Sequence, residues 1–229
     1  MNPIIHAYYT SDLFGKGIFL SLLLLSIATW TIFFKKFIAQ KNIQRVGIVF
    51  QSLFKKKSSN PLSIEVYESH PYANLYQILK KTTIELLGKN KTVIKKENMT
   101  LSVSDIHLIE SYLINVVSTE TKKMEGNLFI LSTVVSLAPF LGLLGTVWGI
   151  LLTFNELQTT ISINSNTTIM GGLAMALGTT VVGLLVAIPA LISYNYLRSA
   201  ITQLSGDLEE FSHLLLSAVE LQYRQVEIS

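Results

Sequence analysis

The chain has 229 residues, of which 49% are hydrophobic and only 14% are charged, and its formal net charge is +3. Soluble domains usually carry about 25% charged residues, so this composition excludes an ordinary soluble protein and indicates an integral membrane protein. Cysteine is absent, which excludes disulfides, thiol catalysis and thiolate metal ligands.

The first apolar run without charges covers residues 17–34, "GIFLSLLLLSIATWTIFF". Its length is close to the minimum of about 17 residues that crosses the hydrocarbon core of a bilayer. Neither a small-residue cleavage site nor a basic segment accompanies it, so we expect an uncleaved anchor rather than a removed signal peptide. Residues 1–16 then form a short segment on the outer side of the membrane.

Residues 35–127 are polar and are expected to be mostly helical. One helix is predicted from "PYANLYQILKKTTIELLG", with Pro71 near its start and Gly88 at its end. A second begins after Ser102, because Asp105 three residues later completes a capping-box pattern. No strong helix breaker follows, so we expect this helix to continue unbroken into the next membrane span.

Two further spans are predicted at residues 128–154 and 169–195, separated by a polar loop at residues 155–168. Residues 196–229 continue the third span as an amphipathic helix, because apolar residues recur there at steps of three and four. These residues are Ile201, Leu204, Leu208, Phe211, Leu215 and Ala218. The predicted fold class is therefore an all-α membrane protein with three transmembrane helices, the second and third extended into the cytoplasm, and a mostly helical cytoplasmic insertion.

The basic residues predict the orientation of the chain. Fifteen of the 18 Lys and Arg residues lie between Lys35 and Lys123, and the loop between the second and third spans has none. By the positive-inside rule the middle segment and the C-terminus are cytoplasmic, whereas the N-terminus and the loop face outward. Three spans give this arrangement, which in a bacterium predicts a multi-pass protein of the inner membrane.

Small residues form a face on each of the last two spans. In lipid, helices associate where small residues allow their backbones to approach closely. The predicted packing residues are Pro139, Gly142, Gly145 and Gly149 on the second span and Gly183, Ala187 and Pro189 on the third. We expect these faces to offer flat surface to neighbouring subunits or to a partner helix.

Thr146 and Thr180 lie near the middle of their spans, with Thr179 beside the second of them. No Asp, Glu, Lys, Arg or His lies in any of the three spans. A threonine hydroxyl can bond water or a proton carrier, but it cannot titrate near neutral pH. If the protein moves protons, another chain must supply the titrating carboxylate. The alternative is that these threonines bond their own helix carbonyls and that the faces only pack helices together.

The stretches "LAPFLGLLGTVWGI" (137–150) and "GTTVVGLLVAIPALISYN" (178–195) resemble the TolQ/ExbB branch of the TolQ/ExbB/MotA proton-channel family. "SIATWTIFFKKF" (26–37) is similar to the first span of the TolQ type in particular. The resemblance implies a pentameric ring of this subunit around the single spanning helix of a TolR- or ExbD-like partner that carries a membrane-embedded Asp. It also implies that Thr146, Thr180 and Thr179 line the proton path, and that the work reaches a TolA- or TonB-like protein.

One position departs from the family pattern. Members commonly carry a Glu five residues before the threonine that matches Thr180, and here that residue is Met175. Sodium coupling therefore remains an alternative to proton coupling, because hydroxyl and carbonyl oxygens also suit Na⁺. Trp148 is predicted to pack between helices. Neither a catalytic motif nor a metal or cofactor site is visible. We therefore expect a protein that is not an enzyme and needs no cofactor. It should contact the lipid bilayer and should not bind nucleic acid.

Three functions remain open at this point. The first is a TolQ-like ring subunit that transmits the proton-motive force to the cell envelope. The second is an ExbB-like subunit that energises TonB-dependent nutrient import. The third is a membrane scaffold that conducts no ion, whereas a solute transporter is disfavoured because no broken span or buried charge is visible.

Overall fold

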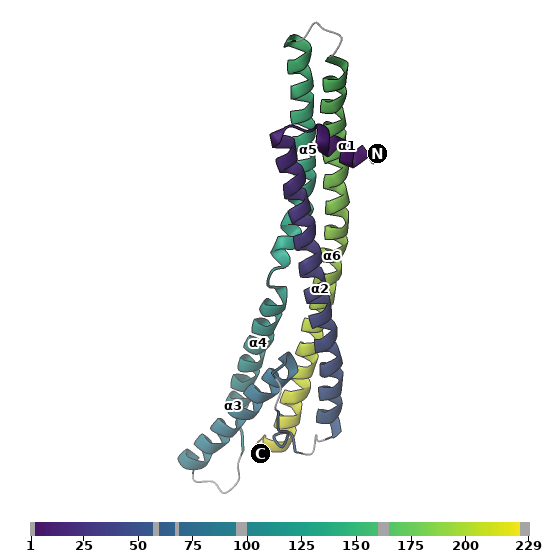
Figure 1. Ribbon diagram of the computed structural model, residues 1–229. Helices are drawn as coiled ribbons and strands as arrows, with labels where there is room; N and C mark the ends of the chain where they lie inside the picture. Colours follow the sequence, from purple (N-terminus) through teal and green to yellow (C-terminus); the bar gives the residue numbers. More distant parts are fainter. Residues whose placement is uncertain (1–2, 57–59, 67–68, 95–99, 160–164, 225–229) are drawn as a thin grey trace. The chain divides into compact units, whose positions relative to one another are not determined.

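The computed structural model describes residues 3–56, 60–66, 69–94, 100–159 and 165–224. Over these residues the chain is all-helical, as predicted, and has six helices (Figure 1). They are α1 (Pro3–Thr10), α2 (Leu13–Lys56), α3 (Pro71–Ile94), α4 (Val103–Glu125), α5 (Leu128–Thr159) and α6 (Ser165–Tyr223).

Three helical stretches are long and apolar enough to cross a membrane, which confirms the predicted number. They are Leu13–Lys56, Val103–Gln158 and Ile169–Tyr223. Helix α6 continues without interruption from the third apolar run into the amphipathic segment. The predicted extension of the third span is therefore confirmed.

The prediction of one unbroken helix through the second span is wrong at two residues. Helix α4 ends at Glu125, where the Gly126 N–H donates to the Lys122 carbonyl, and α5 begins at Leu128. Between them Asn127 has a φ of 67°, in the left-handed region. Asparagine tolerates this region better than most residues, so the Gly-Asn pair is the stop signal that the sequence reading missed.

Other helix ends also differ from expectation. Helix α3 passes Gly88 and continues to Ile94. Helices α5 and α6 enter the predicted loop from both sides, since α5 ends at Thr159 and α6 begins at Ser165. Residues 160–164 of that loop lie outside the described residues. Helix α1, within the segment 1–16, was not predicted at all.

The chain divides into two compact units. The apolar unit comprises Met1–Phe37 and Asn127–Arg198, and the charged unit comprises Ile38–Gly126 and Ser199–Ser229. In the apolar unit a buried cluster joins α2, α5 and α6. Its members are Ile18, Leu22, Val134, Ala138, Val186, Ala187 and Ala190.

The charged unit has a larger core, to which α2, α3, α4 and α6 all contribute. Of the apolar stripe predicted for residues 196–229, Leu204, Leu208, Phe211 and Leu215 are buried in it and Ala218 is partly buried. Its members from α4 and α6 are Ile106, Ile109, Leu113, Val117, Leu204, Leu208, Phe211, Leu215 and Val219. Helices α3 and α4 run antiparallel, because Asn74 bonds Glu120 near one end of the pair and Asn90 bonds Asp105 near the other.

The predicted capping box at the start of α4 is present. The Asp105 N–H donates to the Ser102 hydroxyl at 3.2 Å, and the Ser102 N–H donates to the Asp105 carboxylate at 2.9 Å. We expect Ser102→Ala to lower the free energy of unfolding of the charged unit by about 1 kcal/mol. Thermal unfolding of the purified chain measures this loss. Ser104→Ala, an exposed change in the same turn, is the control and leaves the midpoint unchanged.

The same capping box makes part of the free energy of unfolding of the charged unit sensitive to acid. Burial raises the pKa of Asp105, but hydrogen bonds from the Ser102 N–H and from the Asn90 and Ser102 side chains outweigh it, so the pKa of Asp105 lies below its ordinary value. Because the folded pKa is lowered, the stabilisation is complete above the unfolded pKa of about 3.9 and is lost as pH falls through the folded value. Asp105→Asn is therefore expected to reduce the difference in unfolding midpoint between pH 7 and pH 3. An unchanged difference would contradict this role.

Candidate functional site: the α5–α6 contact and its threonines

Helices α5 and α6 lie side by side in the apolar unit, and glycines set how closely they approach (Figure 1). A methyl group on Gly142 would lie 3.1 Å from the Thr179 carbonyl oxygen of α6. One on Gly149 would lie 2.6 Å from the Gly172 oxygen, and one on Gly183 would lie 2.7 Å from the Ala138 oxygen. The distances at Gly149 and Gly183 are too short for a side chain and the one at Gly142 is tight, so the two backbones are in direct contact.

The remaining glycines of this contact make room for threonine side chains. The Thr179 side chain fills the space that a methyl group on Gly145 would need. The Thr153 hydroxyl likewise occupies the space beside Gly172. The flat surface was expected to receive neighbouring subunits or a partner helix. In the structure α6 of the same chain covers it at Gly142, Gly145 and Gly149.

The predicted path threonines differ in what they bond. The Thr180 hydroxyl donates across the contact to the Gly142 carbonyl at 3.1 Å, whereas the Thr146 hydroxyl donates within α5 to the Leu143 carbonyl at 2.6 Å. The two hydroxyls thus use adjacent carbonyls of α5. Because Gly142 precedes Thr146 by four residues, Thr180 contacts α5 about 6 Å along the axis from Thr146. The packing of α5 on α6 therefore brings the two threonines within about one helical turn of each other.

Burial separates Thr179 from the other two threonines. Thr179 is fully buried, and its hydroxyl lies 2.9 Å from the Ala176 carbonyl and 3.0 Å from the Met175 carbonyl, both in its own helix. Thr146 and Thr180 are half-buried in the chain alone. Their side chains therefore keep accessible surface, while that of Thr179 is enclosed by α5 and α6.

The predicted packing prolines lie inside helices, Pro139 in α5 and Pro189 in α6. A proline has no N–H, so each leaves the carbonyl four residues earlier, in Val135 and Leu185, without its usual helix bond. Ala187 is buried in the cluster with α2 and α5. Ala187 thus lies in a helix-packing region, whereas the packing role of the two prolines stays a prediction.

The sequence reading missed a polar link at the start of α2. One carboxylate oxygen of Asp12 accepts the Gly15 N–H at 2.9 Å and caps α2, and the other accepts the Trp148 indole N–H at 3.0 Å. The Phe14 ring lies 4.5 Å from the Trp148 ring, centroid to centroid. Trp148 therefore packs between helices as predicted. No local signal could reveal its bond to a residue 136 positions away.

Met175 occupies the position where the family resemblance suggests a Glu. Its side chain is 1% exposed and fills the space beside Gly15 of α2. At this position α6 therefore packs against α2 through an apolar contact. The apolar unit has only two carboxylates in its sequence, Asp12 and Glu156, and neither lies within a predicted span.

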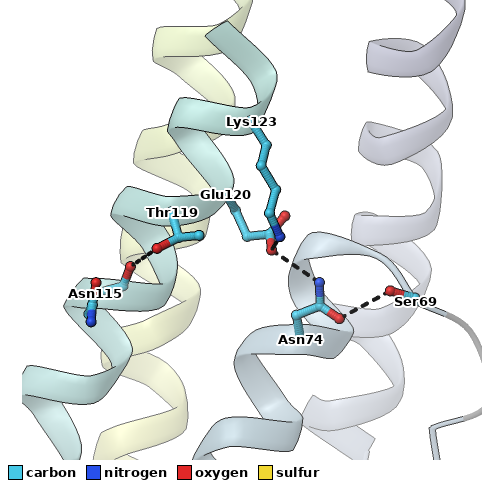
Figure 2. Close-up of polar contacts among 6 residues, drawn as sticks. All are labelled: Ser69, Asn74, Asn115, Thr119, Glu120 and Lys123. Carbon is cyan, nitrogen blue, oxygen red and sulfur yellow. Dashed lines mark hydrogen bonds and ion pairs between the residues drawn. The ribbon is translucent and has the colours of Figure 1, made fainter. Parts of the chain in front are cut away.

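A second polar cluster lies in the charged unit (Figure 2). Glu120 is 7% exposed, and its Oε1 accepts from the Asn74 amide at 3.1 Å and from the Lys123 ammonium at 2.7 Å. Asn74 also lies 3.4 Å from the Ser69 hydroxyl (Figure 2). This cluster joins the start of α3 to α4. Among the described residues no group of three His, Asp or Glu could hold a metal ion.

Comparison with known proteins identifies the family to which the helices of this site belong. Residues 88–210 match the family model described as the MotA/TolQ/ExbB proton channel family, which is more than half of the 229 residues. The chain belongs to this family. The matched range contains α4, α5 and the part of α6 that carries Thr179 and Thr180, whereas Asp12 lies outside it.

The sequence of this chain is similar to proteins named ExbB and to proteins named TolQ. A biopolymer transport protein ExbB of Pseudomonas putida is 30% identical over 214 residues, which are 93% of this chain and 62% of that protein. ExbB of Aquifex aeolicus is 51% identical over 76 residues, 33% of this chain and 51% of that protein. The Tol-Pal system protein TolQ of Pseudomonas aeruginosa is 42% identical over 90 residues, 39% of this chain and 38% of that protein. The chain thus aligns with less than two thirds of the length of each.

Proposed function

We propose that this chain is the ring-forming subunit of an inner-membrane complex that is driven by the proton-motive force. Residues 17–34, 128–154 and 169–195 would cross the bilayer, with the N-terminus outside and the C-terminus in the cytoplasm. The single observation that carries the proposal is the pair of half-buried threonines, Thr146 and Thr180, at the α5–α6 contact. They are polar groups in spans that contain no Asp, Glu, Lys, Arg or His.

The chemistry of these threonines implies a partner. A hydroxyl can donate to and accept from water or a carboxyl group, but it does not ionise near neutral pH. Ionisable groups inside a membrane are the usual carriers in proton relays. We therefore assign the carrier to a single-span protein of the TolR/ExbD type with an intramembrane Asp. Its helix would lie inside a ring, expected to be a pentamer, lined by Thr146 and Thr180.

The output of the complex distinguishes the two forms of this proposal. In the TolQ-like form, which the "SIATWTIFFKKF" stretch favours, proton flow drives a TolA-like protein of a Tol-Pal type system. In the ExbB-like form it drives a TonB-like protein and nutrient import, and the ExbB relative that aligns with 93% of this chain supports that alternative. Deletion of the gene separates them, since leakage through the envelope indicates the first form and loss of TonB-dependent uptake the second.

Reconstitution tests the proposed function directly. The chain is placed in liposomes alone, with the single-span partner, and with a partner whose intramembrane Asp is changed to Asn, and proton uptake is measured under an imposed potential. We expect uptake only with the unmodified partner, because only that complex contains a titrating group in the membrane. An assembled complex that conducts no protons would instead support the non-conducting scaffold. Equal uptake by the chain alone would contradict the assigned partner.

A further inference from the structure

Helix α2 has an exposed apolar face in the charged unit. Ile48 is 70% exposed, Val49 58% and Leu53 48%. Ile48 and Val49 are adjacent and Leu53 follows Val49 by four residues, so the three share one broad side of the helix, next to the side that buries Phe50 and Phe54. The isolated unit leaves this face uncovered.

The same stretch of α2 is basic, and the corresponding stretch of α6 is acidic. From residue 38 to residue 56 the charges are all positive, and from residue 199 to residue 223 they are all negative. The basic residues are Lys41, Arg45, Lys55 and Lys56, and the acidic residues are Asp207, Glu209, Glu210 and Glu220. Each stretch therefore offers the charge that the other lacks.

A groove of about 520 Å³ lies between α4 and α6 in the charged unit. The Thr121 and Ser205 hydroxyls meet at 2.9 Å between the two helices, and Ile114 and Val117 give the groove an apolar part. Its charged lining consists of Lys122, Glu125 and Glu209. Within the described part of the chain the carboxylates of Glu125 and Glu209 make no ion pair, and neither does Arg45 of α2.

The groove and the α2 face match in height along the charged unit. Height here is the distance along each helix from the boundary residue of the unit, which is residue 38 for α2, 126 for α4 and 199 for α6. Two observed contacts support this measure, those of Thr121 with Ser205 and of the Phe50 ring with the Phe211 ring. In each pair the two heights agree within about 2 Å. At a rise of about 1.5 Å per residue, Arg45 lies about 10 Å and Glu209 about 15 Å from the boundary. Val49 and Ile114 lie at about 16 and 18 Å by the same measure.

We propose that the α2 face of one copy of this chain docks into the α4–α6 groove of a second copy. Arg45 faces Glu209, and Ile48 and Val49 cover Ile114. The contact joins two different surfaces whose heights agree within about 5 Å, so it repeats head to tail and forms a ring when the rotation between copies closes. The inference rests on the ring of the proposed function and adds which surfaces join its subunits and why neighbours are arranged head to tail.

Cysteine cross-linking tests this contact, because the native chain has no cysteine. One tagged chain carries Val49→Cys and a second, differently tagged chain carries Ile114→Cys, and both are expressed together in membranes with the single-span partner. We expect a short bifunctional maleimide to join the two tags. Arg45→Glu on the first chain should lower the yield at least about tenfold, since it places like charges across the contact. Glu209→Arg on the second chain should restore it.

Ile84→Cys on α3 replaces Ile114→Cys as the matched control, since Ile84 is 51% exposed but lies outside the groove. Cross-linking of Val49→Cys to Ile84→Cys, or to itself, at an equal or higher yield would overturn the head-to-tail contact. Absence of any cross-link in a complex of ring mass would also overturn it, while the proposed function would stand. A complex that contains one copy by mass would remove the ring and with it both proposals.

Discussion

Replacing Thr146 or Thr180 with valine is expected to lower proton uptake by the assembled complex about 10- to 100-fold. Valine keeps the volume of threonine and removes only the hydroxyl. A hydrogen bond to a charged group contributes about 1.5–3 kcal/mol, and each 1.36 kcal/mol of barrier is about tenfold in rate. Proton uptake into liposomes that contain the complex and its partner measures the effect.

Thr133→Val is the matched control for these variants. Thr133 lies in α5 and is exposed, and its hydroxyl donates to the Phe129 carbonyl at 2.8 Å, so it has the same kind of backbone bond as Thr146. We expect normal uptake from this variant. If Thr146→Val and Thr180→Val also conduct normally at equal assembly, the threonines do not line the path and the scaffold function gains support.

The second large effect is expected where glycines set the approach of α5 and α6. Gly149→Ala and Gly183→Ala should each lower the free energy of unfolding by about 1–3 kcal/mol, because the added methyl groups meet backbone atoms of the facing helix. A backbone oxygen cannot move aside as a flexible side chain can. Thermal unfolding of the purified chain in detergent measures the loss.

Gly17→Ala supplies the control for the glycine variants. A methyl group on Gly17 would meet no atom within 4 Å, although this residue also lies in a predicted membrane span. Alanine is favoured over glycine in a helix by about 0.5–1 kcal/mol, so this change should not destabilise the chain. Equal destabilisation by Gly17→Ala and Gly149→Ala would show that the cost is not caused by the α5–α6 contact.

The two sets of variants also separate packing from conduction. The glycine changes are expected to lower assembly and proton uptake together, since they disturb the contact that positions Thr180 against Gly142. The valine changes are expected to lower uptake while assembly stays normal. A scaffold predicts sensitivity to the first set and none to the second.

Local patterns in the sequence were enough to determine much of this protein. The number of apolar spans follows from run length, because the hydrocarbon core requires a minimum number of residues. The capping box of Ser102 and Asp105 and the apolar stripe of residues 201–218 follow from helical spacing, which covalent geometry sets within a few residues. The absence of Asp, Glu, Lys, Arg and His from the spans is likewise a property of the sequence alone.

The tertiary structure decided which residues meet. The sequence showed that Gly145 and Gly149 form a close-packing motif, but it could not show that Thr179 and Gly172 of the same chain lie against them. The bond from Trp148 to Asp12 depends equally on the rotation and register of two helices. Rotation and register are set by the packing of the whole unit, where many weak contacts compete, and no short segment contains that information. The sequence by itself therefore determined the spans and their polar residues, while packing decided which threonine is enclosed and which keep accessible surface.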